Sequence, residues 1–407
     1  MQLTILSPKD AAELVPALPD SLNPMVWVYR CHDERRGWTL SAATHAEPGS
    51  GKLSLGGFRI APLDRMAAAG FSTEREAVAL AMGMEAKVQW SRVLRIGGPL
   101  GRRESKRMVG GKCVVAPTPG ARVGEPQDAE LLDFSIECFE AIEAEGGFHL
   151  TTGQDMGHGT MHDGVTTSLQ YLNERFAGSA IADTSVPTGE GNFQLLTGML
   201  RGHDIDVRTA TVGLIGCGKV GTRVLERLRE IDANVLVFER HEPRRLELEA
   251  MGVRTWTFPA GVRAASDDGI DAFLAQPMDA LVVNGSGGSL DEIAVEACCA
   301  NLVMKVVCGS ENLVMTDTSL ANLLQQSDKS FAPTELGGMM GYLTAAEEYL
   351  SRRAGVTFDP DTLIAAAADL EQAGFDAVKL ARDSGGALSF AEAVRHLEPS
   401  SGREIRR

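Results

Sequence analysis

The chain has 407 residues, 44% of them hydrophobic, and its 39 basic and 55 acidic side chains give a formal net charge of −16. This length exceeds that of one ordinary domain, so we expect two. The negative charge argues against non-specific binding to nucleic acid or to anionic membranes, and no apolar run reaches the roughly 20 residues of a transmembrane helix.

The N-terminal residues lack the basic start and the long apolar stretch of a secretory signal. The seven cysteines are scattered, mostly in apolar runs, and form no C-x-x-C pair. Reduced, buried thiols in a cytoplasmic protein are therefore expected.

Strand and helix patterns are mixed in the first half of the chain. Residues 25–31 and 36–44 read as the two strands of a hairpin. Residues 73–88 have helical periodicity after a Ser-Thr start, and residues 127–145 form a second helix. Between these helices, residues 91–108 contain Arg92, Arg95, Arg102, Arg103, Lys106 and Arg107. We expect a solvated surface loop there; the alternative is a contact with an acidic group of a substrate, a cofactor or another subunit.

The most informative stretch begins at residue 209. An apolar strand at 209–215 runs into a G-x-G-x-x-G sequence made by Gly216, Gly218 and Gly221. The first glycine permits a tight turn, the second removes a side chain where a pyrophosphate must approach, and the third lets the next helix pack closely. The helix start, with the backbone of Cys217, Lys219 and Val220, then offers free N–H groups to the phosphates. The pattern predicts a dinucleotide site.

The second strand, 234–238, is followed by Glu239, which can accept hydrogen bonds from the adenosine ribose. This carboxylate favours NAD, because it would repel the 2′-phosphate of NADP. Arg240, Arg244 and Arg245 follow closely and could receive that phosphate, so NADP stays an alternative.

Strands and helices alternate through the second half. Further strands are expected at 280–284, 303–308 and 329–332, and helices near 219–231, 243–251, 268–275, 290–300 and 317–325. Such alternation implies parallel strands with right-handed crossovers, as in a doubly wound Rossmann domain. From residue 338 the chain is helical, and we expect these terminal helices to pack back on the first domain of this α/β protein.

Five blocks in this order resemble the glutamate/leucine/phenylalanine/valine dehydrogenase family, and the resemblance runs from about residue 25 to about 350. They are residues 77–87, Val109-Gly-Gly-Lys112, Thr152-Gly-Gln-Asp155-Met-Gly157, Val307-Cys-Gly-Ser310-Glu-Asn312 and Phe331-Ala-Pro333. The resemblance implies NAD-dependent oxidative deamination of an L-amino acid to the 2-oxo acid and ammonia, or the reverse reductive amination.

The resemblance also implies the domain roles. Residues 1–183 would form the α/β substrate, catalytic and oligomerisation domain, 184–340 the NAD(P)-binding Rossmann domain, and 341–407 a helical segment that returns to the first domain. The expected partners are an amino acid or 2-oxo acid and further copies of the chain in a homo-oligomer, without nucleic acid or membrane.

Site residues are carried over by position. Lys87 would bind the substrate carboxylate, aided by the backbone of Gly56 and Gly57 after Leu55. Lys112 would be the catalytic base, its pKa lowered by burial, and Asp155 would shuttle protons and hold the amino group. Gly153 stands where leucine-type enzymes carry Ala, which favours a large apolar or aromatic substrate. Further cofactor contacts would come from Asn284, Gly309, Ser310 and Asn312.

Two departures from the family pattern concern ligand contacts. A threonine beside the nicotinamide falls on Gly191, and the asparagine of the family's N-A-G-G segment is missing at Gly338-Met339-Met340-Gly341. These losses leave a non-catalytic or regulatory NAD-binding homologue as the alternative function.

A third function remains open, a metal-dependent hydrolase or lyase that uses His158 and His162. H-x-x-x-H spacing places two imidazoles on one helical face. The surrounding glycines, Gly157, Gly159 and Gly164, oppose a helix here, so we expect no metal.

Overall fold

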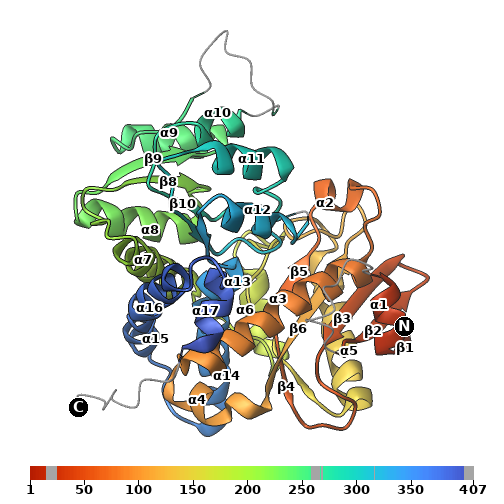
Figure 1. Cartoon of the computed structure of the whole chain (residues 1–407). Coiled ribbons are helices and arrows are strands. Elements are labelled where there is room, and N and C mark those ends of the chain that lie inside the picture. The colour runs from red at the N-terminus through yellow and green to blue at the C-terminus, as the bar shows by residue number, and fades with distance from the viewer. Residues whose placement is uncertain (15–24, 258–265, 267–268, 316, 398–407) are drawn as a thin grey trace. The chain divides into compact units, whose positions relative to one another are not determined.

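The structure is a computed structural model that describes residues 1–14, 25–257, 266, 269–315 and 317–397. The chain forms two compact units (Figure 1). Unit 1 comprises Met1–Gln89, Gly98–Thr184 and Tyr342–Asp359, and unit 2 comprises Trp90–Gly97, Ser185–Gly341 and the chain from Pro360 onwards. No helix in the described ranges has both the length and the apolar character needed to cross a membrane.

Unit 1 is built on a mixed sheet of seven strands. They are β1 (Gln2–Leu6), β2 (Trp27–Asp33), β3 (Trp38–Thr44), β4 (Leu53–Leu55), β5 (Phe58–Ile60), β6 (Met108–Ala116) and β7 (His149–Leu150). The strand order is β1-β2-β3-β6-β4-β7, with β5 also paired to β6. The hairpin expected between residues 25 and 44 is confirmed as the antiparallel pair β2–β3, whereas β4 and β5 run parallel to β6.

Helices complete this unit. They are α1 (Pro8–Leu14), α2 (Leu63–Ala67), α3 (Thr73–Leu94), α4 (Pro99–Glu104), α5 (Asp128–Gly146), α6 (Ser168–Arg175) and α14 (Met339–Ala354), of which α3 and α14 begin or end in unit 2. The buried face of α5 contributes Phe134 and Phe139 to an aromatic core. There Phe139 meets Phe58 edge-on, with ring centroids 5.1 Å apart.

The basic segment is not a loop, so that prediction is wrong. The helix α3 continues to Leu94, and α4 and a 3-10 turn, η2 (Ser105–Arg107), follow. The start of α4 is capped by a distant carboxylate: Glu347 of α14 accepts hydrogen bonds from the backbone N–H groups of Leu100 (2.9 Å) and Gly101 (2.7 Å). These groups have no partner within the helix itself. At Gly98 a Cβ would lie 2.3 Å from the Glu347 side chain, so only glycine leaves room for the cap.

Unit 2 is a parallel sheet, as expected. Its strands are β8 (Thr211–Ile215), β9 (Asn234–Phe238), β10 (Ala280–Val283), β11 (Val306–Gly309) and β12 (Ser330–Phe331), in the order β12-β11-β10-β8-β9. A single parallel bridge, Val237↔Thr255, extends the sheet beyond β9. With that bridge the order matches the Rossmann arrangement, whose crevice opens at the carboxyl ends of β8 and β10.

The helices of unit 2 are α7 (Ser185–Gly202), α8 (Lys219–Glu230), α9 (Glu242–Ala250), α10 (Ile270–Leu274), α11 (Glu292–Ala300), α12 (Leu320–Gln326), α13 (Thr334–Gly337), α15 (Asp361–Ala367), α16 (Asp369–Asp383) and α17 (Phe390–His396). Five of them, α8 to α12, fall close to their predicted places, whereas α7 and α13 were not predicted.

The C-terminal helices need a correction. Only Tyr342–Asp359 groups with unit 1, whereas α15, α16 and α17 group with unit 2. The reason is a close helix crossing. A Cβ at Gly198 of α7 would lie 1.9 Å from the carbonyl oxygen of Glu371, and one at Gly374 of α16 would lie 3.0 Å from that of Leu195. Glycines on both helices let the two backbones approach.

Candidate functional site

A buried ion pair lies in unit 1, between Lys112 and Asp155. Lys112 is on β6 and Asp155 follows β7, and their side chains are 4% and 7% exposed. Nζ of Lys112 donates to Oδ2 of Asp155, while Nε of Arg59 donates to Oδ1 over 3.0 Å. The carboxylate therefore bridges two cations.

Burial and charge move both pKa values. Burial lowers the pKa of Lys112 below its ordinary value, and Arg59 adds to this, while Asp155 opposes it. Burial alone would raise the pKa of Asp155, but Lys112 and Arg59 hold it well below its usual range. The amine thus gives up its proton more readily than a solvated lysine does, and the carboxylate stays charged.

Backbone glycines surround this amine. A Cβ at Gly57 would lie 2.9 Å from Nζ of Lys112, and one at Gly56 would lie 2.0 Å from the carbonyl oxygen of Gly111. The N–H of Gly153 donates to the carbonyl oxygen of Gly56 over 3.3 Å. The structure therefore brings Leu55, Gly56, Gly57, Lys112, Gly153 and Asp155 together.

Lys87 is buried on α3, with 6% exposure. This helix lies directly against β6, because the N–H of Gly110 donates to Oε2 of Glu85 over 2.7 Å. A Cβ at Gly110 would lie 2.1 Å from the Glu85 nitrogen. Gly110 thus lets β6 pack closely against the helix, whereas Gly111 packs against the neighbouring strand, since a Cβ there would lie 2.0 Å from Oγ of Ser54.

Arg59 was not assigned from the sequence. It is 4% exposed on β5 and also forms an ion pair with Glu76, which Arg65 contacts over 3.1 Å. The signal was an arginine inside the short strand Phe58–Ile60, where every residue is buried. A buried cation needs such partners.

The two histidines do not form a metal centre. The ring nitrogens of His158 are engaged, Nε2 with the carbonyl oxygen of Phe58 (2.7 Å) and Nδ1 with Oγ of Ser168 (3.0 Å). His162 is exposed, and its Nδ1 lies 3.4 Å from the carbonyl oxygen of Gly124. Within the described residues, no group of three or more His, Cys, Asp or Glu side chains is arranged to hold a metal.

The glycine fingerprint of unit 2 has the geometry of a dinucleotide cradle. Gly216 has a φ of +77°, and a Cβ there would lie 2.7 Å from the carbonyl oxygen of Asn284. A Cβ at Gly221 would lie 2.1 Å from that of Gly216, whereas one at Gly218 would meet nothing within 4 Å. Two glycines therefore serve packing, and the third leaves open space at the start of α8, whose N-cap has no side-chain hydrogen bond. These features fit a pyrophosphate.

The carboxylate of Glu239, directly after β9, is held by hydrogen bonds from backbone N–H groups. Glu239 accepts from the N–H groups of Cys217 (2.8 Å) and His241 (2.9 Å). Arg244 lies against the same loop, donating to the Cys217 carbonyl oxygen (3.0 Å) and to Oγ1 of Thr222 (2.9 Å). The other two arginines differ, since Arg240 stacks on Phe238 and Arg245 pairs with Glu242 and Glu249.

A second set of polar groups follows β10 and β11. Oδ1 of Asn284 accepts from the N–H (3.1 Å) and the hydroxyl (2.6 Å) of Ser310, while its buried Nδ2 makes no hydrogen bond within the described residues. Gly309 packs on β10, because a Cβ there would lie 2.0 Å from the Val283 carbonyl oxygen. Asn312 belongs to the same segment.

Glu311, beside Ser310, was missed. It is 2% exposed, accepts from the N–H of Ser289 over 2.9 Å, and burial raises its pKa. A Cβ at Gly285 would lie 2.5 Å from its Oε2. The glycine therefore makes room for the acid.

The two departures from the family pattern, at Gly191 and at the segment that contains Met340, lie in direct contact. A Cβ at Gly191 would lie 2.7 Å from Cγ of Met340, and Met340 is fully buried. A threonine at 191 would thus clash with the methionine that occupies the altered segment.

Comparison with known proteins gives this geometry a context. Residues 182–267 match the model of the D-isomer specific 2-hydroxyacid dehydrogenase, NAD binding domain. The chain is 28% identical over 251 residues to a phenylalanine dehydrogenase of Lysinibacillus sphaericus, covering 59% of each. It is 24% identical over 325 residues to a valine dehydrogenase of Streptomyces virginiae, covering 79% of this chain and 80% of the relative. The chain resembles the amino acid dehydrogenases.

Solved amino acid dehydrogenases share the fold. L-tryptophan dehydrogenase from Nostoc punctiforme superposes with a TM-score of 0.58 at 16% identity, over 90% of this chain and 92% of that one. Hetero-hexameric glutamate dehydrogenase from Thermus thermophilus gives a TM-score of 0.63 at 16% identity, over 95% and 91%. The resemblance and the fold class predicted from the sequence are confirmed.

Proposed function

We propose that the protein is an NAD-dependent amino acid dehydrogenase, which converts an L-amino acid into its 2-oxo acid and ammonia and catalyses the reverse reaction. The observation that carries this proposal is the buried Lys112–Asp155 pair against the Gly56-Gly57 backbone. It stands in a chain that also holds a complete dinucleotide fingerprint. Unit 1 would bind the substrate and unit 2 the cofactor.

Substrate binding would depend on Lys87, as a cation for the carboxylate. The substrate amino group, once neutral, would be held by the Asp155 carboxylate, which Arg59 fixes in orientation. Bound NAD supplies the hydride acceptor for the hydrogen on Cα.

Lys112 would act on water. As a neutral amine it takes a proton from the water molecule that adds to the imino carbon, and the carbon–nitrogen bond then breaks to release ammonia. Its lowered pKa supports this role, because a solvated lysine would hold its proton at neutral pH. A permanently charged arginine could not serve.

The cofactor preference follows from Glu239. Two backbone N–H groups hold this carboxylate toward the glycine loop, and it keeps lone pairs for the ribose hydroxyls. Arg244 is the residue that would contact a 2′-phosphate, because it donates to the Cys217 carbonyl oxygen in that loop.

Both alternative functions have less support. Engaged ring nitrogens oppose His158 as a metal ligand. A non-catalytic homologue has no chemical need for Lys112 and Asp155 in one buried pair.

Assembly and location are part of the proposal. We expect a closed homo-oligomer, since one structural neighbour is a hetero-hexamer and most oligomers are symmetric. Light scattering after size exclusion tests this. A cytoplasmic location fits the free thiols of all seven cysteines.

The deciding experiment follows reduced nicotinamide by absorbance at alkaline pH, with a panel of L-amino acids and either NAD or NADP. We expect turnover with large apolar or aromatic amino acids and NAD. Lys112→Ala should abolish turnover and leave NAD affinity nearly unchanged. Cofactor binding without turnover of any amino acid would overturn the proposal.

A further inference from the structure

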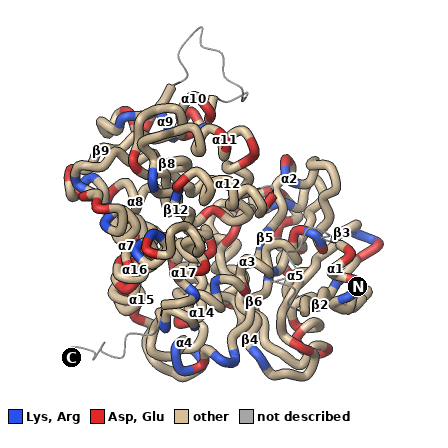
Figure 2. Tube along the Cα trace, in the orientation of Figure 1, with Lys and Arg blue, Asp and Glu red and all other residues tan. Residues whose placement is uncertain are grey.

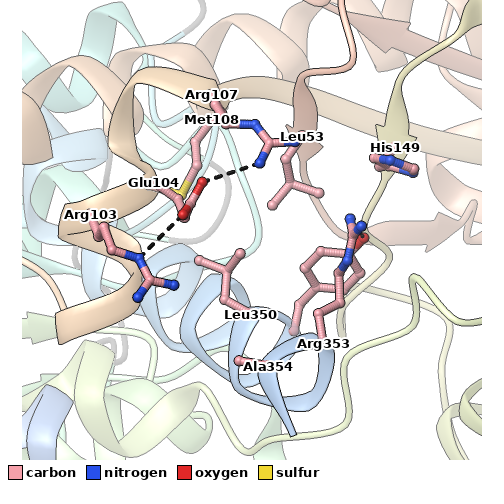
Figure 3. A pocket seen from close by; sticks show the side chains of 10 residues that line it. Leu53, Arg103, Glu104, Arg107, Met108, His149, Leu350, Arg353 and Ala354 are labelled. Carbon is pink, nitrogen blue, oxygen red and sulfur yellow. Dashed lines mark hydrogen bonds and ion pairs between the residues drawn. The ribbon is translucent and has the colours of Figure 1, made fainter.

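The basic segment and the end of α14 enclose a pocket in unit 1 that the proposed reaction does not use. Its volume is about 220 Å³, and its lining consists of Leu53, Arg103, Glu104, Arg107, Met108, His149, Tyr349, Leu350, Arg353 and Ala354. Figure 3 shows the arginines at its rim and the apolar side chains of Leu53 and Leu350 between them. Figure 2 shows the basic residues gathered around α4.

The pocket is separate from the Lys112–Asp155 pair. Leu53, Met108 and His149 are the first residues of β4, β6 and β7, and they are paired in register in a parallel sheet. They therefore lie side by side at the starts of these three strands. Lys112 lies four residues further along β6, about 13 Å away at roughly 3.3 Å per residue.

The lining of the pocket has three arginines and one acidic residue, Glu104. Glu104 is shared by Arg103 and Arg107, each over 3.3 Å. Arg353 donates to the neutral hydroxyl of Tyr349 over 3.0 Å, and its charge also acts on Glu143, whose pKa burial raises and the arginine lowers. Glu143 is not part of the lining, and its Oε1 lies 3.9 Å from Nδ1 of His149.

Many guanidinium donors of these arginines make no hydrogen bond to the residues that the structure describes. Arg103 uses Nε, Arg107 uses one nitrogen for Glu104 and another for the Gly51 carbonyl oxygen, and Arg353 uses one. Each guanidinium carries five N–H donors in a planar fork that matches carboxylate or phosphate oxygens.

The backbone of the basic segment is anchored next to the pocket. Glu347 anchors the start of α4 through two hydrogen bonds from backbone N–H groups, which fixes the backbone that leads to Arg103 and Arg107, while their side chains are 67% and 61% exposed. In a chain of net charge −16, three arginines around one apolar floor form a local positive field.

We propose that this pocket binds a small organic oxyanion, a phosphate ester or a dicarboxylate, whose charged group or groups meet the guanidinium groups of Arg353, Arg103 and Arg107. The apolar floor takes the short carbon body. The volume is below that of most drug-sized sites, about 300–1,000 Å³, which limits the ligand to a few carbon atoms.

Calorimetric titration of the full chain tests the proposal, with glycerol phosphate and succinate as probes, which distinguish the two ligand sources. Arg353→Gln should weaken binding at least about tenfold, because hydrogen bonds to charged groups are worth about 1.5–3 kcal/mol. Glu104→Gln should strengthen binding, since it removes the internal competitor.

The matched control is Arg175→Gln. Arg353 is exposed and stacks on Tyr349. Arg175 is likewise exposed and stacks on Tyr171, yet it lies outside the pocket, so its replacement should leave the affinity unchanged. Phosphate bound at the start of α8 would not respond to Arg353→Gln. The proposal is overturned if neither probe binds, or if Arg353→Gln binds as tightly as the unaltered protein.

Discussion

At the residue scale, the charge of Asp155 controls the proton affinity of Lys112. The carboxylate raises the pKa of the amine, while burial and Arg59 lower it. Asp155→Asn removes the opposing charge, so the pKa of Lys112 must fall further. We expect the acid limb of the pH profile of kcat/KM to move to lower pH, with a lower plateau.

If the variant has too little turnover to follow, the rate at which Lys112 reacts with an amine-acylating reagent gives the same pKa by peptide mass spectrometry. Asp163→Asn is the control, since that side chain is exposed and bonds only to the local loop. An acylation midpoint for Lys112 that stays in place or rises in Asp155→Asn contradicts the proposed coupling.

Gly153 sets a second expectation at this scale. A Cβ there would meet only Cβ of Ala345, at an ordinary 3.8 Å, so Gly153→Ala should fold normally. The added methyl narrows the proposed substrate pocket. We expect kcat/KM for phenylalanine to fall relative to valine by about tenfold or more, in line with the effect of one methylene in an apolar pocket.

The control is Gly159→Ala, where a Cβ would meet only Val123, at 3.9 Å. It should leave the ratio of the two substrates as it is. A ratio that is also unchanged in Gly153→Ala would remove this glycine from the substrate pocket.

At the scale of elements, the cap from Glu347 decides the form of the basic segment. In Glu347→Gln the side chain keeps its shape but loses its charge and one acceptor, so Leu100 or Gly101 loses a partner. We expect the free energy of unfolding, measured in urea, to fall by about 1–2 kcal/mol, as for a lost cap. Hydrogen exchange should become faster in residues 99–107. The exposed Glu137→Gln on α5 should stay within about 0.5 kcal/mol, and equal values for both variants would contradict the cap.

The same element explains what sequence could and could not predict. The Rossmann unit was predictable because its signals are local: strand, glycine turn, helix and acidic residue follow each other within 31 residues, 209–239. Lys112 and Asp155 could be singled out because each lies in a short sequence block that resembles a known family. The helix α4 was not, because its capping acid lies 246 residues away. The helix α16 was misplaced, since the fit of Gly374 against α7 exists only in three dimensions.

Buried acids mark the same limit within the site. Nothing near Glu311 in the sequence signals that Gly285 leaves room for it. Likewise, the sequence alone gives Gly191 as a lost contact, whereas in the structure the side chain of Met340 fills the space beside it. Pairs of residues that compensate each other across the fold are invisible to spacing rules.

At the scale of the whole molecule, the two units predict how NAD acts on stability. If unit 2 alone holds the cofactor, saturation with NAD at 100 times its Kd should stabilise that unit by about 2.7 kcal/mol. Hydrogen exchange should then slow in β8, the start of α8 and the end of β10, whose backbones line the cradle.

The variant Lys112→Ala tests whether protection by NAD depends on unit 1. The substitution lies on β6 of unit 1, so the protection of unit 2 by NAD should persist in full. Gly218→Val places a side chain in the open space where the pyrophosphate would approach, and it should abolish the protection while the apoprotein stays folded. If NAD protects β6 and leaves β8 unaffected, the assignment of cofactor binding to unit 2 fails. If Lys112→Ala removes the protection, the lysine serves cofactor binding rather than the water step.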